Sequence, residues 1–351
     1  MKAIVVERSA EAGLPPLAWR DVPDVSPAPG EVLVEVHAAA LNRADLMQRA
    51  GTYPPPPGAS EILGLEMAGI VRSLGQGVGG LEVGERVCAL LPGGGYAELV
   101  TVPASMLMRV PERMTMVQAA AVPEVFLTAY SALFWEGRLQ PGEIVLVHAG
   151  ASGVGTAAIQ LARRSGCRVF VTCGGLEKAR ACEALGAELA VDYRVDDFED
   201  RIRHHLGDDV PIAAVGPGGV GGPGGVDVIV DLVGTDYFDR NLRLLNVKGR
   251  LVFVAAQSGP QVTMNILALT SKRLELIGVT LRARHVDEKV RLKNAFLERF
   301  GHDLGAGAIR PVIDSVYPIT EAQDAHAYMA ENRNVGKIVL AVREGPASSP
   351  P

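Results

Sequence analysis

The sequence predicts an α/β protein in which a doubly wound parallel sheet is inserted into a β-rich domain. Three observations predict this fold. Short apolar strands alternate with helical segments through the middle of the chain, a glycine-rich turn follows the first of these strands, and the first third consists of short strands separated by Gly and Pro. At 351 residues the chain is large for one hydrophobic core, so two domains are expected.

The glycine-rich turn at residues 148–155, with the sequence HAGASGVG, is the most informative segment. The apolar run 143–147 before it has the β-branched bias of a buried parallel strand, and residues 156–164 after it have helical spacing. A strand, a tight turn and a helix start bring backbone N–H groups toward one point. Glycine is needed there because a Cβ would block the approach of phosphates and of helix to strand. The segment therefore predicts a diphosphate-binding turn.

The alternation continues beyond this turn. Further strands are predicted at 167–172, 189–193, 226–232, 249–255 and 274–279, and helices at 176–185, 196–206 and 236–245. Strands that alternate with helices indicate a parallel, doubly wound sheet. The glycine turn follows the first strand of the series, where a dinucleotide-binding fold requires it.

The two ends of the chain are predicted to form the second domain. Strands are expected at 2–6, 31–36, 68–74, 85–90, 96–102 and 106–110, as in a small barrel or sandwich. Thr115 is expected to cap a helix through residues 118–121, which Pro123 then complicates. The last segments predict a helix at 290–299, a strand at 312–317, a helix at 320–332 and a strand at 337–341. They are too few for a core of their own, so we expect them to complete the N-terminal module, with a ligand cleft between the two domains.

Composition excludes several classes of protein. With 48% hydrophobic and 21% charged residues the chain is globular, and its net charge of −6 gives no support for binding nucleic acid or anionic membranes. The first apolar run is too short for a signal peptide, and none approaches the ~20 residues of a membrane span. A cytoplasmic enzyme is expected. The cysteines show no metal-binding spacing and are expected to be buried, reduced thiols: Cys88, Cys167, Cys173 and Cys182.

Two other interpretations of the glycine turn are disfavoured. Residues 150–154 resemble a nucleophile elbow around Ser152, but Val154 stands where that motif needs Gly, and no His–acid pair is marked out to serve the serine. The phosphate-binding motif of NTPases is absent from the sequence. His148 is expected to be a packed turn residue rather than an acid–base group.

Several motifs together resemble the zinc-independent quinone oxidoreductases of the medium-chain dehydrogenase/reductase superfamily, of which zeta-crystallin is a member. They lie at residues 40–49, 55–66, 91–95, 148–155, 317–323 and 334–339. The resemblance implies a GroES-like catalytic domain, residues 1–123 and 273–343, around a Rossmann domain, residues 124–272, with a flexible tail at 344–351. It also implies a homodimer that pairs through the edge strand 274–279.

Zinc-dependent relatives in that superfamily hold a catalytic metal with Cys, His and an acidic residue. This chain has Asn42 at the position of the first ligand Cys and Leu65 where a His would precede Glu66, and it lacks the four-Cys structural lobe. An amide is a poor zinc ligand compared with thiolate or imidazole. We therefore expect no catalytic zinc. Glu66 and Asp45 are expected to be hydrogen-bonded structural carboxylates.

Without a metal, catalysis consists of positioning and charge stabilisation while a hydride passes to an electron-poor acceptor. Asn42 and Tyr53 match cleft positions of the family and are expected to offer amide and phenol donors to quinone oxygens. They are the predicted catalytic residues. Gln48 and Arg282 join them as predicted substrate-binding residues, beside the stiff run Pro54–Pro57.

NADPH is the predicted cofactor. A preference for NAD would place Asp or Glu at the end of the second strand, whereas this chain has Gly174 and Gly175, which leave room for a 2′-phosphate. By the resemblance, Lys178 is the basic partner, with Tyr193 downstream, while Glu177 adds a negative charge nearby. The full set of expected cofactor contacts is Tyr53, Thr128, Gly150, Ala151, Ser152, Gly153, Val154, Gly155, Gly174, Gly175, Lys178, Tyr193, Val254, Ala255, Thr280, Leu281, Asn334, Gly336 and Lys337.

Three functions stay open on the sequence. The first is an NADPH-dependent quinone reductase, and the second is a reductase of activated alkenes such as 2-enoyl thioesters or enones. The third is a non-catalytic NADPH-binding protein with a structural or RNA-binding role, against which the acidic charge argues.

The glycine-rich run 215–225 lies outside the resemblance and is expected to be a surface loop.

Overall fold

The computed structural model describes residues 1–7, 13–207 and 224–343. It divides into two compact units, one formed by Met1–Leu127 together with the chain from Leu281 onward, the other by Thr128–Thr280. We call them the β-rich unit and the doubly wound unit. The expected boundaries were 123 and 272. The doubly wound unit ends later because residues 275–278 pair with its sheet.

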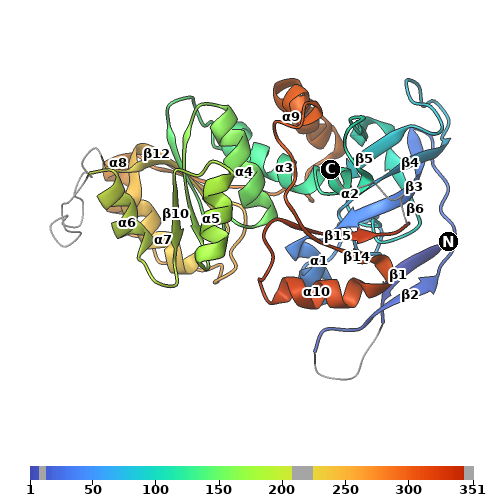
Figure 1. Ribbon diagram of the computed structural model, residues 1–351, viewed down its shortest axis with the longest axis horizontal. Coiled ribbons are helices and arrows are strands. Elements are labelled where there is room, and N and C mark those ends of the chain that lie inside the picture. Colours follow the sequence, from blue (N-terminus) through green and yellow to red (C-terminus); the bar gives the residue numbers. More distant parts are fainter. Residues whose placement is uncertain (8–12, 208–223, 344–351) are drawn as a thin grey trace. The chain divides into compact units, whose positions relative to one another are not determined.

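The doubly wound unit contains a six-stranded parallel sheet with the strand order β10-β9-β8-β11-β12-β13 (Figure 1). The strands are β8 (Ile144–Val147), β9 (Arg168–Cys173), β10 (Leu189–Asp192), β11 (Val226–Asp231), β12 (Leu245–Phe253) and β13 (Glu275–Gly278). The helices are α4 (Gly153–Arg164), α5 (Leu176–Ala184), α6 (Phe198–His205), α7 (Phe238–Leu244) and α8 (Ile266–Lys272). The predicted doubly wound sheet is thus confirmed. Its order reverses between β8 and β11, the place where such sheets bind ligands.

Apolar side chains from strands and helices fill the core of this unit. Leu146, Phe170, Ile229 and Leu251 come from four neighbouring strands and are fully buried. Phe198 of α6 packs against the same cluster. These strands are buried on both faces, which explains their nearly continuous apolar sequences.

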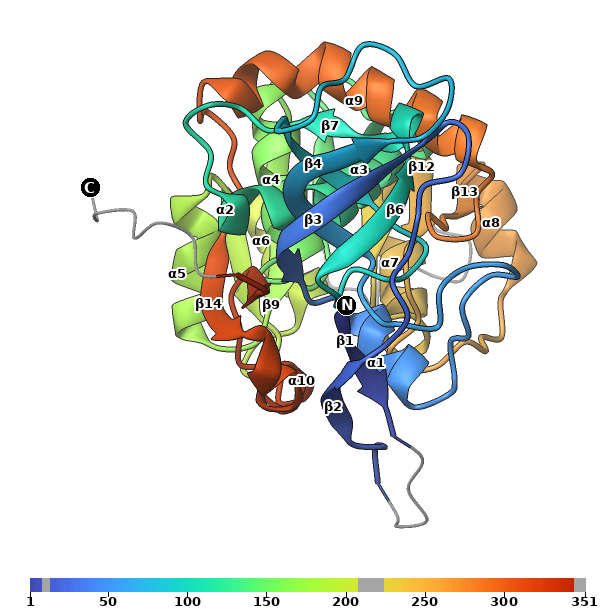
Figure 2. The same cartoon turned by 90° about the vertical axis from the view of Figure 1, so that its right-hand side faces the viewer.

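The β-rich unit contains a seven-stranded sheet, with the order β14-β15-β3-β4-β5-β7 and with β6 paired to β3 (Figure 2). Its strands are β3 (Glu31–Ala40), β4 (Glu66–Leu74), β5 (Arg86–Leu90), β6 (Leu99–Pro103), β7 (Met108–Arg109), β14 (Ile313–Pro318) and β15 (Lys337–Ala341). A separate two-stranded sheet pairs β1 (Lys2–Val6) with β2 (Leu17–Asp21). The helices of the unit include α1 (Arg43–Arg49), α2 (Met116–Ala120), α9 (Val286–Gly305) and α10 (Ala322–Ala330).

The C-terminal segment completes this unit, because β15 pairs antiparallel with β3 and parallel with β14. Thr115 caps α2 as predicted: its hydroxyl accepts the Gln118 N–H and the Gln118 side chain returns to the Thr115 N–H. Pro123 does not interrupt that helix. It begins a new one, α3 (Pro123–Tyr130), since the first turn of a helix needs no N–H from proline. Helix α3 continues into the π-helical segment η2 (Ser131–Glu136).

The elements that were not expected from the sequence include β2, α1, α3, η2 and α8. The four cysteines are buried and form no disulfide, as predicted. Within the described residues, no helix has both the length and the apolar character needed to cross a membrane. Residues 215–223 of the glycine-rich run and the tail 344–351 lie outside the described residues.

Candidate functional site

The glycine turn of the doubly wound unit packs as tightly as its sequence predicts. The Gly150 N–H donates to the Thr172 carbonyl oxygen at 2.8 Å, which fixes the turn against β9. A Cβ on Gly150 would lie 2.5 Å from the Val171 Cβ, and a Cβ on Gly155 would lie 2.5 Å from the carbonyl oxygens of Ala149 and Gly150. Both glycines are therefore required by the approach of α4 to the strands.

The start of α4 presents backbone N–H groups. Ser152 is the N-cap, and its hydroxyl accepts the Gly155 N–H at 3.0 Å. The N–H groups of Gly153 and Val154 precede the first intrahelical hydrogen bonds and point out of the N-terminus, where the helix dipole favours an anion. With the close approach that Gly150 and Gly155 allow, this arrangement fits the diphosphate of a dinucleotide. The predicted residues 150–155 all lie in this turn and first helical turn.

The end of β9 forms a second feature beside α5. Gly175 has a φ of +105°, and its N–H donates to the Asp192 Oδ1 at 2.9 Å. A Cβ on Gly174 would lie 2.7 Å from the Tyr193 hydroxyl and 3.1 Å from the Arg194 Nε, so both side chains lie against this glycine. Lys178 is in the first turn of α5. Sequence reasoning missed Arg194, although its position next to the expected Tyr193 was a usable signal.

Other predicted cofactor residues lie at or near the carboxyl ends of the parallel strands. Val254 and Ala255 follow β12, and their N–H groups donate to the Asp231 carbonyl oxygen. Thr280 follows β13. Thr128 belongs to α3, and its hydroxyl is buried with no hydrogen-bond partner in the described part of the chain.

His148 is a packed turn residue, as expected. Its Nδ1 lies 3.0 Å from the Thr172 Oγ1 and its Nε2 lies 2.8 Å from the Asn241 Oδ1. The ring contacts the aromatic rings of Phe198 and Tyr237 edge-on. Burial lowers the pKa of His148, so the imidazole is neutral at pH 7.

A buried polar cluster lies in the β-rich unit, where Asn42 caps α1, Glu66 begins β4 and Lys337 begins β15. The Lys337 Nζ lies 2.8 Å from the Glu66 Oε1 and 2.7 Å from the Asn42 Oδ1. The Asn42 Nδ2 donates to the same Glu66 oxygen at 3.0 Å. Lys337 also donates to the Leu41 carbonyl oxygen. The exposed fractions of Lys337 and Glu66 are 3% and 0%, so this ion pair is shielded from water.

The Asn42 amide, the expected quinone donor, binds protein acceptors in this structure. Its Nδ2 donates to the Ala40 carbonyl oxygen at 3.3 Å as well as to Glu66, which uses both amide hydrogens. The expected role of Asn42 as a quinone donor stays a prediction, and in this structure its side chain contacts Glu66 and Lys337. Lys337, expected to contact the cofactor, is likewise held by protein acceptors. Asn334 and Gly336 build the turn before β15, where the Asn334 Nδ2 donates to the Gly336 carbonyl oxygen at 2.7 Å.

This donor set does not fit a zinc ion. The Glu66 Oε1 accepts from Asn42 and from the Lys337 ammonium, while the Oε2 accepts the Glu124 N–H at 2.8 Å. A positive side chain thus lies against the Glu66 carboxylate, and the Asn42 amide, a poor zinc ligand, stands where the resemblance places a thiolate. The ammonium neutralises Glu66 in place of a metal.

Asp45 has the structural role that the sequence suggested. Its Oδ2 accepts the Asn42 N–H at 2.8 Å and its Oδ1 accepts the Gly64 N–H at 3.1 Å. The Tyr96 hydroxyl donates to it as well, at 3.2 Å. Burial raises the pKa of Asp45 to about 6 in spite of these bonds. The carboxylate joins α1 to the loop before β4.

Glu124 is a second acid that sequence reasoning missed. It lies in the first turn of α3, where its backbone N–H binds Glu66, and its carboxyl Oε2 is buried without a partner among the described residues. Burial and the nearby charge of Glu66 raise the pKa of Glu124 to about 8. The group therefore holds a proton at pH 7. An acid after a helix-starting proline gives no sign of burial in the sequence.

Tyr53, Gln48 and Arg282 come together in the β-rich unit, although they were predicted separately. The Arg282 Nε and Nη2 donate to the Pro92 carbonyl oxygen at 2.9 and 2.7 Å, and the Nη2 also donates to the Gln48 Oε1 at 2.6 Å. The guanidinium carbon lies 5.2 Å from the centroid of the Tyr53 ring. Arg282 is only 4% exposed, and its Nη1 is buried without a hydrogen-bond partner among the described residues.

The raised pKa of Glu124 predicts a specific pH dependence of stability. A folded-state pKa above the ordinary value stabilises the fold below about pH 4.5, and this contribution is lost as the pH rises through about 8. The charged groups that face Glu124 are Glu66, Asp45, Lys337 and Lys289. The Tm of the wild type should fall as the pH rises from about 6 to 9. In Glu124→Gln this fall should be smaller by about 5 °C, as measured by thermal denaturation.

The matched control is Glu112→Gln, which removes one exposed carboxylate from the same unit. It should leave the slope of Tm against pH as it is in the wild type. Equal slopes for the wild type and Glu124→Gln would show that Glu124 is ionised at neutral pH, contrary to this assignment.

Comparisons with known proteins agree with this geometry. The alcohol dehydrogenase GroES-like domain family matches residues 28–112, and the zinc-binding dehydrogenase family matches residues 185–340. The synaptic vesicle membrane protein VAT-1 homolog of Mus musculus is 34% identical over 336 residues, which are 90% of this chain and 77% of that protein. The quinone oxidoreductase of Rattus norvegicus is 31% identical over 326 residues, 91% of this chain and 92% of the relative.

Solved structures give the same result. The mycobacterial protein Rv1454c, solved in complex with NADPH, has a TM-score of 0.82 and 31% identity over 97% of this chain and 99% of its own. A 2-haloacrylate reductase has a TM-score of 0.78 and 28% identity over 98% of this chain and 100% of its own. This chain therefore belongs to the medium-chain dehydrogenase/reductase superfamily, among its zeta-crystallin-like quinone oxidoreductases.

Proposed function

We propose that this oxidoreductase transfers a hydride from NADPH to quinones without a metal. The observation that carries the proposal is the Lys337 ammonium, which pairs with Glu66 and with Asn42, the residue that by resemblance replaces the first zinc-ligand Cys. A quinone needs no Lewis acid for reduction, because its developing oxyanion is delocalised and accepts protons readily. Quinone oxidoreductases are also among the relatives that match nearly the whole chain.

The doubly wound unit provides the residues that would hold NADPH. The turn at residues 150–155 would bind the diphosphate, and Gly174, Gly175, Lys178, Tyr193 and Arg194 would surround the 2′-phosphate. The nicotinamide would lie near the strand ends, with contacts from Thr128, Val254, Ala255 and Thr280. From the β-rich unit we propose Tyr53, Leu281, Asn334 and Gly336. When bound, NADPH supplies the hydride.

Arg282 and Tyr53 are the proposed acceptor-binding groups, together with Gln48. A buried guanidinium N–H without a protein partner is a strong donor for an oxygen that gains negative charge. The Tyr53 phenol lies beside it and adds a second donor. Gln48 fixes the guanidinium from the other side through its Oε1. Glu124 holds a proton on its carboxyl group in the same unit.

Reduction of activated alkenes is the second candidate. The structural similarity to a 2-haloacrylate reductase favours it, because a halogenated acrylate is an activated alkene. The Arg282 Nη1 would suit a substrate carboxylate or thioester oxygen as well as a quinone oxygen.

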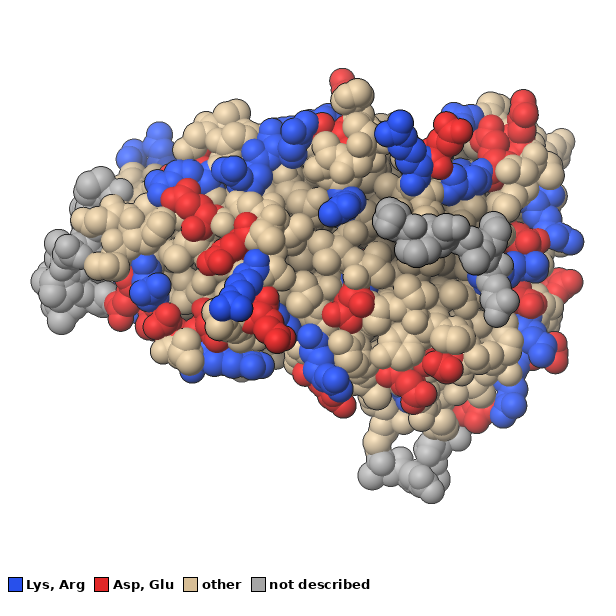
Figure 3. All heavy atoms as spheres, in the orientation of Figure 1, with Lys and Arg blue, Asp and Glu red and all other residues tan. Residues whose placement is uncertain are grey.

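A non-catalytic NADPH-binding role is the third candidate. On the face shown in Figure 3, basic and acidic side chains are interspersed. That distribution does not favour RNA, which is bound through clustered positive charge.

We also propose a homodimer through β13, an edge strand of its sheet in which Leu276 is 37% exposed. A cytoplasmic location stays a prediction.

The direct test follows NADPH oxidation with ortho- and para-quinones beside 2-enoyl thioesters. We expect quinone-dependent oxidation that Tyr53→Phe reduces about tenfold and Arg282→Gln about a hundredfold, because both remove donors to the oxyanion. Turnover of enoyl substrates with no quinone activity would transfer the assignment to the second candidate. NADPH binding without turnover of any acceptor would favour the third.

Arg194 provides a test of cofactor choice. Arg194→Gln should raise the KM for NADPH about tenfold and leave the KM for NADH within about twofold, because only NADPH carries the 2′-phosphate. Steady-state kinetics with both cofactors measure this ratio. Arg180→Gln, an exposed change on α5, is the matched control and should alter neither KM. Equal effects of Arg194→Gln on both cofactors would remove Arg194 from the phosphate site.

A further inference from the structure

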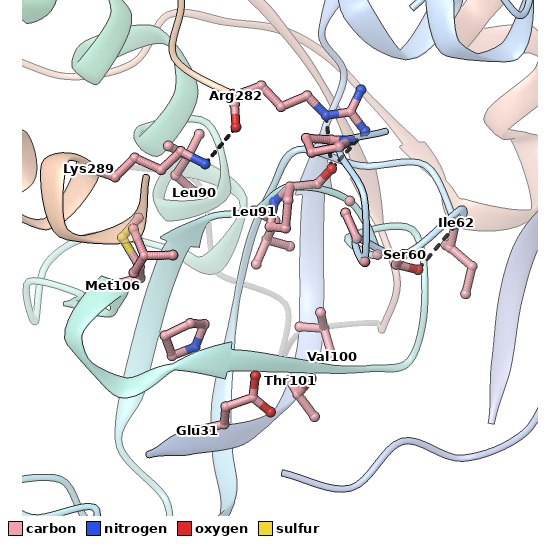
Figure 4. Close-up of a pocket in the computed structure, with 18 of the residues that line it drawn as sticks. Glu31, Ser60, Ile62, Leu90, Leu91, Val100, Thr101, Met106, Arg282 and Lys289 are labelled. Atoms are coloured by element: carbon pink, nitrogen blue, oxygen red, sulfur yellow. Dashed lines mark hydrogen bonds between the residues drawn. The ribbon is translucent and has the colours of Figure 1, made fainter. Parts of the chain in front are cut away.

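A cavity of about 450 Å³ lies within the β-rich unit (Figure 4). Its walls come from the loop at residues 56–62, the end of β5 with the turn that follows it, strand β6, and the loop at residues 282–289. The volume is in the range of small-molecule sites. The proposed acceptor-binding residues are Arg282, Tyr53 and Gln48. Among them, Arg282 lines this cavity.

The middle of the cavity is apolar. Ile62, Leu91, Val100 and Met106 line it. Two of the polar lining groups, Ser60 and Lys289, are directed at protein partners. The Ser60 hydroxyl accepts the Ile62 N–H at 3.2 Å, and the Lys289 Nζ donates to the Arg282 carbonyl oxygen at 2.7 Å. The walls therefore suit a hydrocarbon better than a polar molecule.

The two ends of the cavity differ in charge. Figure 4 shows Arg282 at one end and Glu31 at the other, with the apolar residues between them. Arg282 brings a buried cation with an unpartnered Nη1, and the same side chain contacts Gln48 and the Tyr53 ring. The Glu31 carboxylate disfavours a second anionic group at the far end. A fitting ligand thus carries its oxygen at the Arg282 end and an uncharged chain beyond it.

We propose that this cavity binds an alkyl or isoprenoid chain attached to the carbonyl-containing electron acceptor. The inference rests on the proposed acceptor site at Arg282 and Tyr53, and it names the substrate class: long-chain quinones or enones rather than bare rings. At roughly 30 Å³ per heavy atom, the volume holds about 15 atoms, enough for a chain of about ten carbons. Burial of that chain provides binding that a ring alone lacks.

The test compares 2,3-dimethoxy-5-methyl-1,4-benzoquinone with its decyl derivative, since both have the same reactive ring. In the wild type, kcat/KM should be at least about tenfold higher for the decyl compound. Thr101→Trp, which fills the cavity from the half-buried face of β6, should bring the ratio of the two values to about one. Thr101→Phe is a smaller filling change for use if the tryptophan variant does not fold.

The matched control is Val83→Trp, which adds the same bulk at a residue that is 65% exposed and does not line the cavity. It should keep the wild-type ratio. A preference for the decyl quinone that is equal in the wild type and in the folded cavity-filling variant would overturn the proposal. A pair of enones with short and long chains, assayed in the same way, distinguishes acyl-type from quinone-type acceptors.

Binding of 2-dodecanone, measured by calorimetry on the full chain, separates the cavity from the proposed function. Binding to the wild type that Thr101→Trp abolishes supports the cavity even if no quinone is reduced. Quinone turnover without any effect of chain length or of 2-dodecanone leaves the proposed function in place and removes this inference.

Discussion

The β-rich unit depends on the buried ion pair between Lys337 and Glu66. The two residues are far apart in the sequence, and the pair joins the first residue of β15 to the first residue of β4, with Asn42 of the α1 cap between them. Two charges removed from water are favourable only when their geometry and additional hydrogen bonds compensate for desolvation. Here Asn42, the Leu41 carbonyl oxygen and the Glu124 N–H supply those bonds. These contacts hold the C-terminal strand β15 in the β-rich unit, whose other strands come mostly from the N-terminal part of the chain.

The same interaction determines which chemistry the unit offers. A carboxylate paired with an ammonium is a poor metal ligand, and the Asn42 amide hydrogens bind protein acceptors in this structure. We propose that polarisation of an acceptor falls to Arg282, whose Nη1 has no hydrogen-bond partner among the described residues, with the Tyr53 ring beside the guanidinium. The doubly wound unit contributes a different constraint, since Gly150 and Gly155 allow a backbone approach that no side chain permits.

Local sequence patterns predicted most of the fold. Apolar runs with turn residues between them located the parallel strands, and the Thr115–Gln118 spacing located a capping box. Helix α1 was missed because it has only seven residues, and α8 because Ile266 and Leu267 are exposed, so neither shows a helical apolar stripe. The strand at 274–279 was predicted, but the domain boundary was set before it, whereas its pairing with β12 places it in the doubly wound unit.

The sequence indicated candidate residues for the site, but it did not indicate which of them contact one another. Asn42, Gln48 and Tyr53 were proposed from the family resemblance, and Arg282 from its place after the last strand of the parallel series. That the Asn42 amide faces Glu66, and that Lys337 lies between them, depends on contacts between residues separated by up to 295 positions. Glu124 gave no pattern of its own, since a lone acid is usually solvated, and the only signal for Arg194 was its position next to Tyr193. Burial in the folded protein, which gives Glu124 its raised pKa, cannot be read from neighbouring residues.

The most direct test of this account is quinone-dependent NADPH oxidation by the full-length protein before and after dialysis against a strong chelator, with zinc content measured by mass spectrometry. The account predicts an unchanged rate and no zinc retained by the active protein. Loss of activity on chelation, followed by recovery on addition of zinc, would contradict it.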